Sequence, residues 1–395
     1  MGDDWFERLF GLPERGGPEA LRRAVDVQRD AAGGLWLQTA AGRFRVGAFS
    51  LPTLAELRAR GAAALSAAAL SAAAGAGGTG GVALTHAATR SVLSEHASHP
   101  GATFQAASQF NCLEFSAPSV TPEDGIAGYE HDHTQGPDCA LACAAGTLYR
   151  NYLLPMPSGA VGQSAGEQLD TLDSLGRALG NDAAGYWRVR NGYSTLGAGG
   201  PDALRRLGAL LDGACDDDAE ALRGCVRVGL QQDVGVTWAS RGARPREEVR
   251  VHQVYCSALS LGAYAGGVPP SLWRPVGTLV LDAAYEATLW AAVLAGSPRV
   301  FLTLLGGGVF GNPPEWIAAA IGRAVARLEA AGARLDVTLL HFRSVDEGAR
   351  ALVDAAVCSA RSAPRTAHAA AAAAPQRVGA DVHSRRGTCC YGCSQ

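Results

Sequence analysis

Two stretches of this chain combine glycine, acidic and polar residues in patterns that could do chemistry. The first runs from an apolar segment into Gly306, Gly307 and Gly308, continues through Val309, Phe310, Gly311 and Asn312, and leads into a proline-started helix. Glycines let backbone N–H groups approach an anion closely, and the N-terminus of a following helix adds partial positive charge. A simple turn needs only one or two glycines, so this loop predicts anion binding. We also expect a positive φ at Gly307 or Gly308.

The second stretch is EHDHTQGPDCALAC, residues 130–143. Asp138 follows Pro137 at the start of a predicted helix, and Asp132 lies in the loop before it. Either carboxylate could serve as a general base or hold a water molecule for hydrolysis. The alternative is an ordinary loop acid or a charge that stabilises a helix N-terminus.

The same stretch also carries thiols and imidazoles. Cys139 and Cys143 are four residues apart on one helical face, so they could bind zinc together with His131 and His133. A nucleophilic Cys–His arrangement is a further alternative, although no third orienting group is evident. Two buried thiols and two solvated histidines explain the pattern equally simply. We therefore assign no metal and no cofactor.

Three other patterns stay open. Tyr285 and Glu286 in an apolar helix could approach a site or form a hydrogen-bonded buried pair. RNGYSTL (190–196) could contact a base, but Arg–Asn–Gly is also a common turn. The terminal CCYGC could be acylated or bind metal, or its thiols could be incidental.

Periodic segments predict an α/β fold. ATFQAA (102–107) is typical of a buried strand, and LVLDAAYEATLWAAVL (279–294) of a buried helix. LWLQT and RFRVGAF favour a hairpin. From residue 279 the order is helix, strand, glycine loop, helix, strand and helix, which indicates a mostly parallel sheet with helices on both faces.

This closing segment resembles the macrodomains, a family that binds ADP-ribose. Their corresponding loop has the form Gly-x-Gly-[Val/Ile]-[Phe/Tyr]-Gly, which residues 306–311 match. The resemblance implies that this loop holds the diphosphate and that Phe310 lies against the distal ribose. It also implies a three-layer α/β/α fold.

The resemblance extends upstream. TFQAASQFNCLEF (103–115) is similar to the family's strand ending in Asn-Ala-Ala-Asn, and QGPDCALACAAG (135–146) to its Gly-Gly-Val-Asp-Gly-Ala-Ile segment. On this match Asn111 and Asp138 are the candidate catalytic residues. The implied ligand contacts are Ser108, Asn111, Gln135, Gly136, Pro137, Cys139, Gly306, Gly307, Gly308, Val309, Phe310, Gly311 and Asn312. VALTHAATRSVL (82–93) lacks the family's adenine-binding aspartate, so the resemblance assigns no adenine contact.

Changes in composition along the chain predict its domain boundaries. We expect an α+β segment at 1–60, a low-complexity Ala/Ser/Gly linker at 61–81, the macrodomain-like domain at 82–358, and a disordered tail at 359–395. We expect both biased segments to be dispensable for folding.

Charge and apolar content indicate which kinds of binding partner the protein is not expected to have. Net charge is −3 and 18% of residues are charged, so we expect no nucleic-acid partner. The absence of lysine excludes a Walker or Schiff-base lysine. The acidic start is not a secretory signal, and no strongly apolar run is long enough to span a membrane, so a cytoplasmic protein is expected.

Three functions are compatible with these residues and patterns. The chain could bind free or protein-linked ADP-ribose, remove ADP-ribose from a modified substrate, or keep the fold without a ligand. A loop acid near Asn111 separates the first two, and Asp138 is the candidate.

Overall fold

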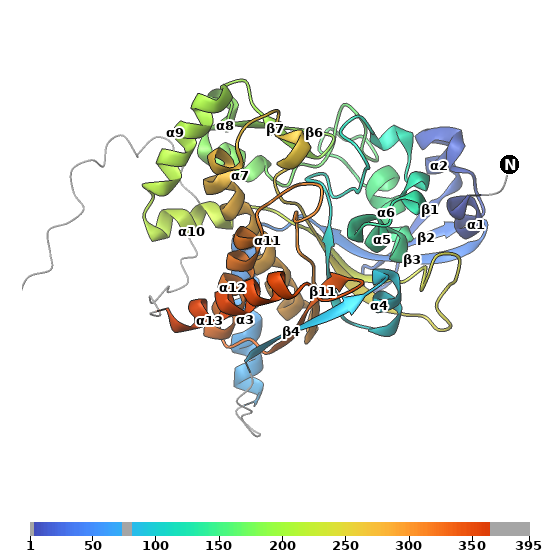
Figure 1. Cartoon of the computed structure of the whole chain (residues 1–395). Coiled ribbons are helices and arrows are strands. Elements are labelled where there is room, and N and C mark those ends of the chain that lie inside the picture. The colour runs from blue at the N-terminus through green and yellow to red at the C-terminus, as the bar shows by residue number, and fades with distance from the viewer. Residues whose placement is uncertain (1–3, 73–80, 364–395) are drawn as a thin grey trace, which may run out of the picture.

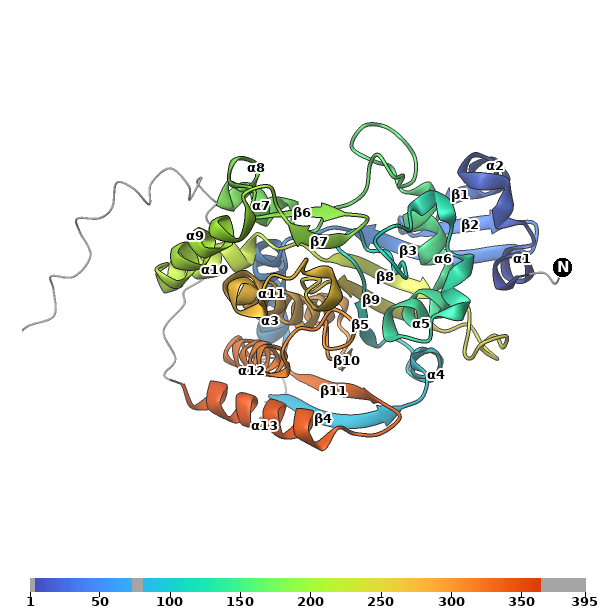
Figure 2. The ribbon, with the colours of Figure 1, turned by 45° about the horizontal axis from the view of Figure 1, so that its top comes forward.

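A nine-stranded mixed sheet organises the part of the chain that the structure describes. The computed structural model describes residues 4–72 and 81–363 (Figure 1). In spatial order the strands are β1 (Asp26–Arg29), β2 (Leu35–Thr39), β3 (Gly42–Ser50), β8 (Gly229–Gly235), β9 (Arg250–Cys256), β5 (Thr103–Ala107), β10 (Arg299–Leu302), β11 (Leu335–Phe342) and β4 (Val82–Thr89). Figure 2 shows β4 and β1 at opposite sides of the molecule.

The half of the sheet from β9 to β4 is parallel throughout. Carboxyl ends of parallel strands meet at one edge, where ligands bind in open α/β sheets. The predicted strand at 102–107 is confirmed as β5, which lies centrally between β9 and β10. The other half is antiparallel, because the confirmed β2–β3 hairpin joins the sheet through β8.

Helices cover both faces, as predicted, and each layer has its own apolar core. One layer contains α3 (Leu54–Ala72), α7 (Asp173–Leu179), α9 (Gly200–Asp212), α10 (Asp216–Gly224), α11 (Pro270–Ala295), α12 (Pro314–Ala330) and α13 (Glu347–Ser362). The other contains α1 (Trp5–Phe10), α2 (Gly17–Ala24), α4 (Val92–Ser98), α5 (Gln135–Ala142), α6 (Ala144–Leu148) and η4 (Tyr149–Leu153). The fold is therefore α/β with three layers.

Shorter elements connect these layers. They are η1 (Glu14–Gly16), η2 (Pro122–Asp124), η3 (Ala127–His131), α8 (Asn181–Ala184), η5 (Gly262–Tyr264), and the strands β6 (Trp187–Arg190) and β7 (Tyr193–Leu196). Asn191 and Gly192 connect β6 to β7, and both have positive φ. This is the geometry of a tight hairpin turn, so the turn interpretation of RNGYSTL is correct.

The closing segment follows the predicted order α11, β10, glycine loop, α12, β11 and α13. Within the described ranges, α11 is the one helix long and apolar enough to cross a membrane, and 78% of its most apolar window is buried in the protein. Its neighbours α3, α9 and α12 surround it, so its apolar surface serves the core.

The predicted linker at 61–81 is wrong for residues 61–72, which continue α3. Thr53 and Glu56 form a reciprocal capping box at its start, and alanine favours helix propagation. The Cα of Gly61 packs against Trp290 of α11 so closely that a Cβ would lie 2.3 Å from the indole ring. The helix is thus part of the core. Residues 73–80 and the tail after 363 lie outside the described residues.

The segment at 1–60 is not a separate domain. β1 to β3 extend the same sheet, and Phe10 of α1 packs on Phe44 of β3 within the second core.

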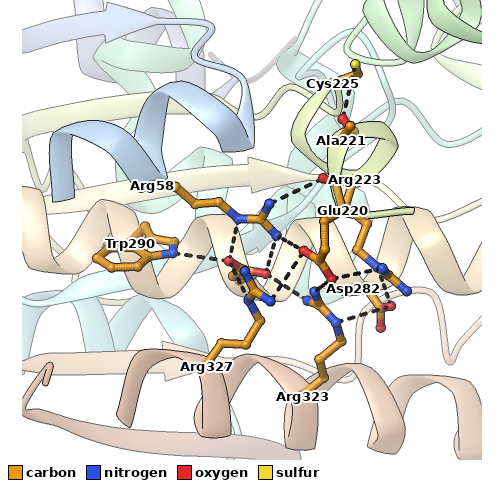
Figure 3. A network of polar contacts seen from close by, with 10 residues as sticks. Arg58, Glu220, Ala221, Arg223, Cys225, Asp282, Trp290, Arg323 and Arg327 are labelled. Atoms are coloured by element: carbon orange, nitrogen blue, oxygen red, sulfur yellow. Dashed lines mark hydrogen bonds and ion pairs between the residues drawn. The ribbon is translucent and has the colours of Figure 1, made fainter. Parts of the chain in front are cut away.

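Helices α3, α10, α11 and α12 are joined by a network of four arginines and three carboxylates (Figure 3). Glu286 lies at its centre with 1% of its side chain exposed and accepts hydrogen bonds from Arg58, Arg323 and Trp290. Burial alone would raise the pKa of Glu286, but these arginines outweigh it and hold the pKa below its usual range. The buried structural interpretation of Glu286 is therefore confirmed.

Candidate functional site

The glycine loop follows β10 at the carboxyl edge of the parallel strands (Figure 2). Positive φ occurs at Gly306 (+74°) and Gly311 (+65°). The expectation of a positive φ at Gly307 or Gly308 is wrong, because the loop reverses direction at its two ends. A Cβ at Gly308 would meet no atom within 4 Å.

The backbone donors of this loop are only partly used by acceptors within the described residues. Among the described residues, the N–H groups of Gly308, Val309 and Phe310 have no hydrogen-bond partner. Gly307 and Gly308 are exposed, and Val309 is 71% exposed. Three consecutive free N–H groups on an exposed loop form a concentration of partial positive charge suited to an anion.

Side chains beneath the loop fix its shape. The Tyr285 hydroxyl donates to the Thr303 carbonyl at 2.7 Å and accepts the Leu305 N–H at 2.9 Å. Asn312, 3% exposed, donates its amide to the carbonyls of Leu259 and Gly306. Tyr285 is therefore a structural support of the loop rather than a side chain exposed to a ligand.

The start of α5 lies beside the end of β5. The Gln135 side chain accepts the Ala107 N–H and donates to the Gln105 carbonyl. Gly136 packs so tightly that a Cβ would lie 2.0 Å from the Ala107 oxygen. Gln105 also accepts the Thr303 N–H through its side chain. The α5 start and the glycine loop thus flank the same strand end.

Asp138 is buried and forms an ion pair with Arg241. The Arg241 guanidinium also donates to the carbonyls of Glu130 and Asp132, which ties the acid to the preceding loop. Burial raises the pKa of Asp138, and Arg241 only partly offsets this. Asp138 therefore has both a fixed orientation and increased proton affinity.

The structure places Asn111 inside the protein, with no exposed surface. Its amide donates to Gln168 at 2.8 Å and accepts the Leu113 N–H. Gly192 of the hairpin turn covers it, since a Cβ there would lie 2.6 Å from the Asn111 oxygen. Ser108 is also buried, and its hydroxyl donates to the Gln109 carbonyl. In this structure both side chains hold the turn after β5.

Phe310 belongs to a cluster of three aromatic rings. Its centroid lies 5.5 Å from that of Tyr193 and 6.0 Å from that of Tyr264. Tyr193 donates its hydroxyl to the Phe115 carbonyl, and the Leu261 N–H donates to the Phe310 carbonyl. The cluster thus connects the glycine loop to the loop after β9 and to the β6–β7 hairpin.

The predicted thiols and imidazoles do not converge. Cys139 and Cys143 are fully buried, and burial raises the pKa of each thiol. His131 and His133 are exposed. Within the described residues, no three His, Cys, Asp or Glu side chains are grouped to hold a metal ion. A neutral buried thiol is a poor nucleophile, so the Cys–His alternative is disfavoured.

Two residues near this edge were missed from the sequence. Phe342 ends β11 and is 60% exposed, with the Arg343 guanidinium 4.9 Å from its ring centroid. Glu114 is 2% exposed, and neither of its carboxylate oxygens has a hydrogen-bond partner among the described residues. In residues 113–115 (Leu-Glu-Phe) a charged residue lies between two apolar ones, which is the pattern of a strand with one exposed face. Only the tertiary fold shows that this glutamate is internal.

Two cavities of about 500 and 360 Å³ lie on either side of residues Glu130 and His131. Asp4, Glu14 and Glu123 contribute to the larger cavity, and Trp238 and Arg241 to the smaller. Neither is lined by the glycine loop. The free donors of the loop, rather than cavity size, define the anion chemistry of the candidate site.

Comparison with known proteins gives only distant matches. No family model matches the chain, and no curated protein matches it. Similar solved structures include poly(ADP-ribose) glycohydrolase from Deinococcus radiodurans in complex with ADP-ribose, with 14% identity, a TM-score of 0.42, and coverage of 79% of this chain and 95% of that one. Poly(ADP-ribose) glycohydrolase from Thermomonospora curvata bound to the inhibitor ADP-HPD has 15% identity and a TM-score of 0.40, with coverage of 85% and 95%. At this similarity neither structure assigns an activity to the chain.

Proposed function

We propose that this protein binds ADP-ribose or a related nucleotide diphosphate at the carboxyl edge of β5 and β10. The observation that carries the proposal is the run of three free backbone N–H groups at Gly308, Val309 and Phe310. A diphosphate is a ligand group that suits several consecutive free backbone donors on an exposed glycine loop. The macrodomain-like pattern of residues 306–311 supports the same choice.

The neighbouring elements suggest where the rest of the ligand binds in this proposal. The distal ribose lies toward the aromatic cluster of Phe310 and the start of α5 at Gly136. The base lies toward the end of β11, where the exposed ring of Phe342 offers a flat apolar surface for stacking. Asn111 contributes through the turn it holds, because its amide is already bonded.

A second candidate is hydrolysis of the bond at the distal ribose. Asp138 favours it, because a buried carboxyl with raised pKa at a helix start can position or deprotonate water. The Arg241 pair would orient this carboxyl toward the ligand. Binding is nevertheless the more direct consequence of the loop geometry, and hydrolysis depends on it.

Calorimetric titration with ADP-ribose, AMP and NAD tests the proposal. We expect ADP-ribose to bind most tightly and AMP much more weakly, because AMP lacks the second phosphate that the loop donors need. Equal affinity for AMP and ADP-ribose would contradict diphosphate recognition.

A further inference from the structure

Two histidine side chains from adjacent parallel strands bond to each other near the carboxyl edge of the sheet. His86 belongs to β4 and His341 to β11, and His86 Nδ1 lies 2.9 Å from His341 Nε2. His341 is 3% exposed, and the His86 side chain is 7% exposed. We call these two residues the histidine pair.

The histidine pair connects α13 to the sheet at two points. His86 Nε2 lies 3.2 Å from a carboxylate oxygen of Asp354, within α13. His341 Nδ1 accepts the backbone N–H of Asp346 at 3.3 Å. Asp346 is the N-cap of α13, because its carboxylate accepts the Ala349 N–H. The pair therefore holds the residue at which the helix begins.

These contacts determine where the ring protons lie. A backbone N–H can only donate, so His341 Nδ1 carries no proton, and the Nε2–H of this ring donates to His86 Nδ1. His86 consequently carries its proton on Nε2 and donates it to Asp354. Each ring nitrogen makes one bond, and both rings are neutral in this arrangement.

An added proton does not fit this chain of bonds. One proton already lies between His86 Nε2 and Asp354, and a second lies between the two rings. Whichever ring takes the charge, an arrangement that keeps these two bonds has a proton on His341 Nδ1, opposite the Asp346 N–H. Two donors then face each other, so the bond to Asp346 is lost.

The turn between β11 and α13 is strained and depends on such bonds. Arg343 has a φ of +66°, the left-handed conformation in a non-glycine residue, which persists only where the surrounding structure holds it. Its N–H donates to the Thr89 carbonyl at 2.8 Å, and the Asp346 bond holds the other end of the turn. The turn directly follows Phe342, whose ring lies beside the Arg343 guanidinium.

We propose that the histidine pair is a pH-sensitive anchor, which holds residues 343–346 at neutral pH and releases them when it gains a proton in mildly acidic solution. This conformational role does not depend on any ligand. Its effect on the ligand rests on the proposed function, in which the base lies against Phe342. Release of the turn that follows this ring should lower ADP-ribose affinity.

The surroundings of His341 favour its neutral form. Burial and the neighbouring His86 ring lower the pKa of His341, and Asp346 and Glu347 only partly offset them. Because the folded pKa lies below the ordinary value of 6.5, the unfolded chain binds more protons as pH falls through that value. The contribution of His341 to stability is therefore present at neutral pH and is lost in acid.

Other charged groups on the surrounding elements are already paired. Arg350 of α13 lies 3.6 Å from Asp354, so it shares that carboxylate with His86. On α12, Glu329 pairs with Arg361 near the start of β4. These pairs leave the bond to the Asp346 N–H as the contact that an added proton breaks.

The test measures hydrogen–deuterium exchange of residues 343–349 in the full chain from pH 5 to 8, corrected for the intrinsic pH dependence of amide exchange. His341→Asn keeps a neutral acceptor oxygen near the position of Nδ1 but cannot gain a proton there. His252→Asn is a matched control in the antiparallel half of the sheet. His252 Nδ1 accepts the Asp233 N–H at 3.2 Å, and burial lowers the pKa of His252 as well.

We expect corrected exchange of this segment in the wild type to accelerate about 2–10-fold between pH 7.5 and pH 5.5, the size expected for one lost hydrogen bond. His341→Asn should show no acceleration, and His252→Asn should keep it. ADP-ribose affinity, measured by calorimetry over the same range, should fall in the wild type and stay constant in His341→Asn.

The outcomes separate this inference from the binding function. Wild-type exchange that does not change with pH, or that accelerates equally in His341→Asn, overturns the anchor. If His341→Asn does not fold, His86→Gln decides: loss of the neighbouring ring should move the acceleration to higher pH, and an unchanged midpoint contradicts the assignment. Affinity that stays constant while the turn opens overturns the link to the ligand. Failure of the wild type to bind ADP-ribose overturns the proposed function, and exchange still decides the role of the histidine pair.

Discussion

At the scale of single residues, the glycines of the loop after β10 have different physical roles. Gly306 and Gly311 supply left-handed backbone, and Gly306 has no room for a side chain, since a Cβ would lie 2.5 Å from that of Ala258. Gly308 has neither constraint. We propose that this position is glycine because of the ligand rather than the turn.

This difference predicts that alanine destabilises the protein at one position and not at the other. Gly306→Ala should lower the free energy of unfolding by at least about 1–3 kcal/mol, because it forces a non-glycine residue into a left-handed conformation and an overlap. Gly308→Ala should leave stability nearly unchanged. Thermal melts measure the stability of both variants. Equal stability losses would contradict the different roles assigned to Gly306 and Gly308.

Asp138 also belongs to this scale. If its carboxyl positions water for hydrolysis, Asp138→Ala should lower turnover of an ADP-ribosylated peptide at least about tenfold with little change in ADP-ribose affinity. Turnover assays paired with calorimetry measure both quantities. Full activity in the variant would remove Asp138 from the mechanism and leave the binding function as the better supported one.

At the scale of elements, the shape of the glycine loop depends on hydrogen bonds from helix α11, which precedes β10 in the sequence. Tyr285 of α11 bonds both sides of the chain where β10 ends. Removing this hydroxyl leaves the buried Leu305 N–H and the partly buried Thr303 carbonyl without their partner, which costs about 1–3 kcal/mol.

Tyr285→Phe should therefore destabilise the protein and also weaken ADP-ribose binding, because the loop loses its support. Tyr152→Phe is a matched control, since it removes a buried hydroxyl that bonds Glu14 in the other helical layer. We expect the control to lower the melting temperature without changing affinity. Equal effects of the two variants on affinity would contradict the supporting role of Tyr285.

The sequence predicted elements best where the pattern was local. The strand at 102–107, the buried helix at 279–294 and the closing order from α11 to α13 are set by apolar periodicity. The later part of helix α3, residues 61–72, was missed because an Ala/Ser/Gly run has no strong apolar face, and only contact with Trp290 shows that it is core. Likewise, Glu114 and Phe342 are distinguished by burial and exposure that depend on distant segments.

At the scale of the whole molecule, the charge network of Figure 3 fixes four helices on the face of the sheet opposite α5. The pKa of Glu286 is held below its ordinary value of 4.5. A carboxyl with a lowered folded pKa stabilises the protein above its unfolded pKa and loses that contribution as pH falls.

Glu286→Gln should thus cost about 3–5 kcal/mol near pH 7, because it leaves three partly buried arginines without their central, buried counter-charge. The difference from wild type should shrink as pH falls below about 4.5, where the unfolded carboxyl becomes protonated. Urea unfolding at pH 7 and at pH 3 measures this. A difference independent of pH would mean that packing, rather than charge, gives Glu286 its effect.

The central claim is that a diphosphate binds the free N–H groups beside Gly308, and ADP-ribose affinity of Gly308→Glu against Gly308→Gln tests it most directly. The two side chains have nearly equal size and differ in charge, and space at this position is open. Two unit charges about 4 Å apart at an effective dielectric near 20 repel by roughly 4 kcal/mol, which weakens binding on the order of a thousandfold. We predict that loss for Gly308→Glu, a much smaller one for Gly308→Gln, and wild-type melting temperatures for both. Unchanged affinity in folded Gly308→Glu would contradict the diphosphate site.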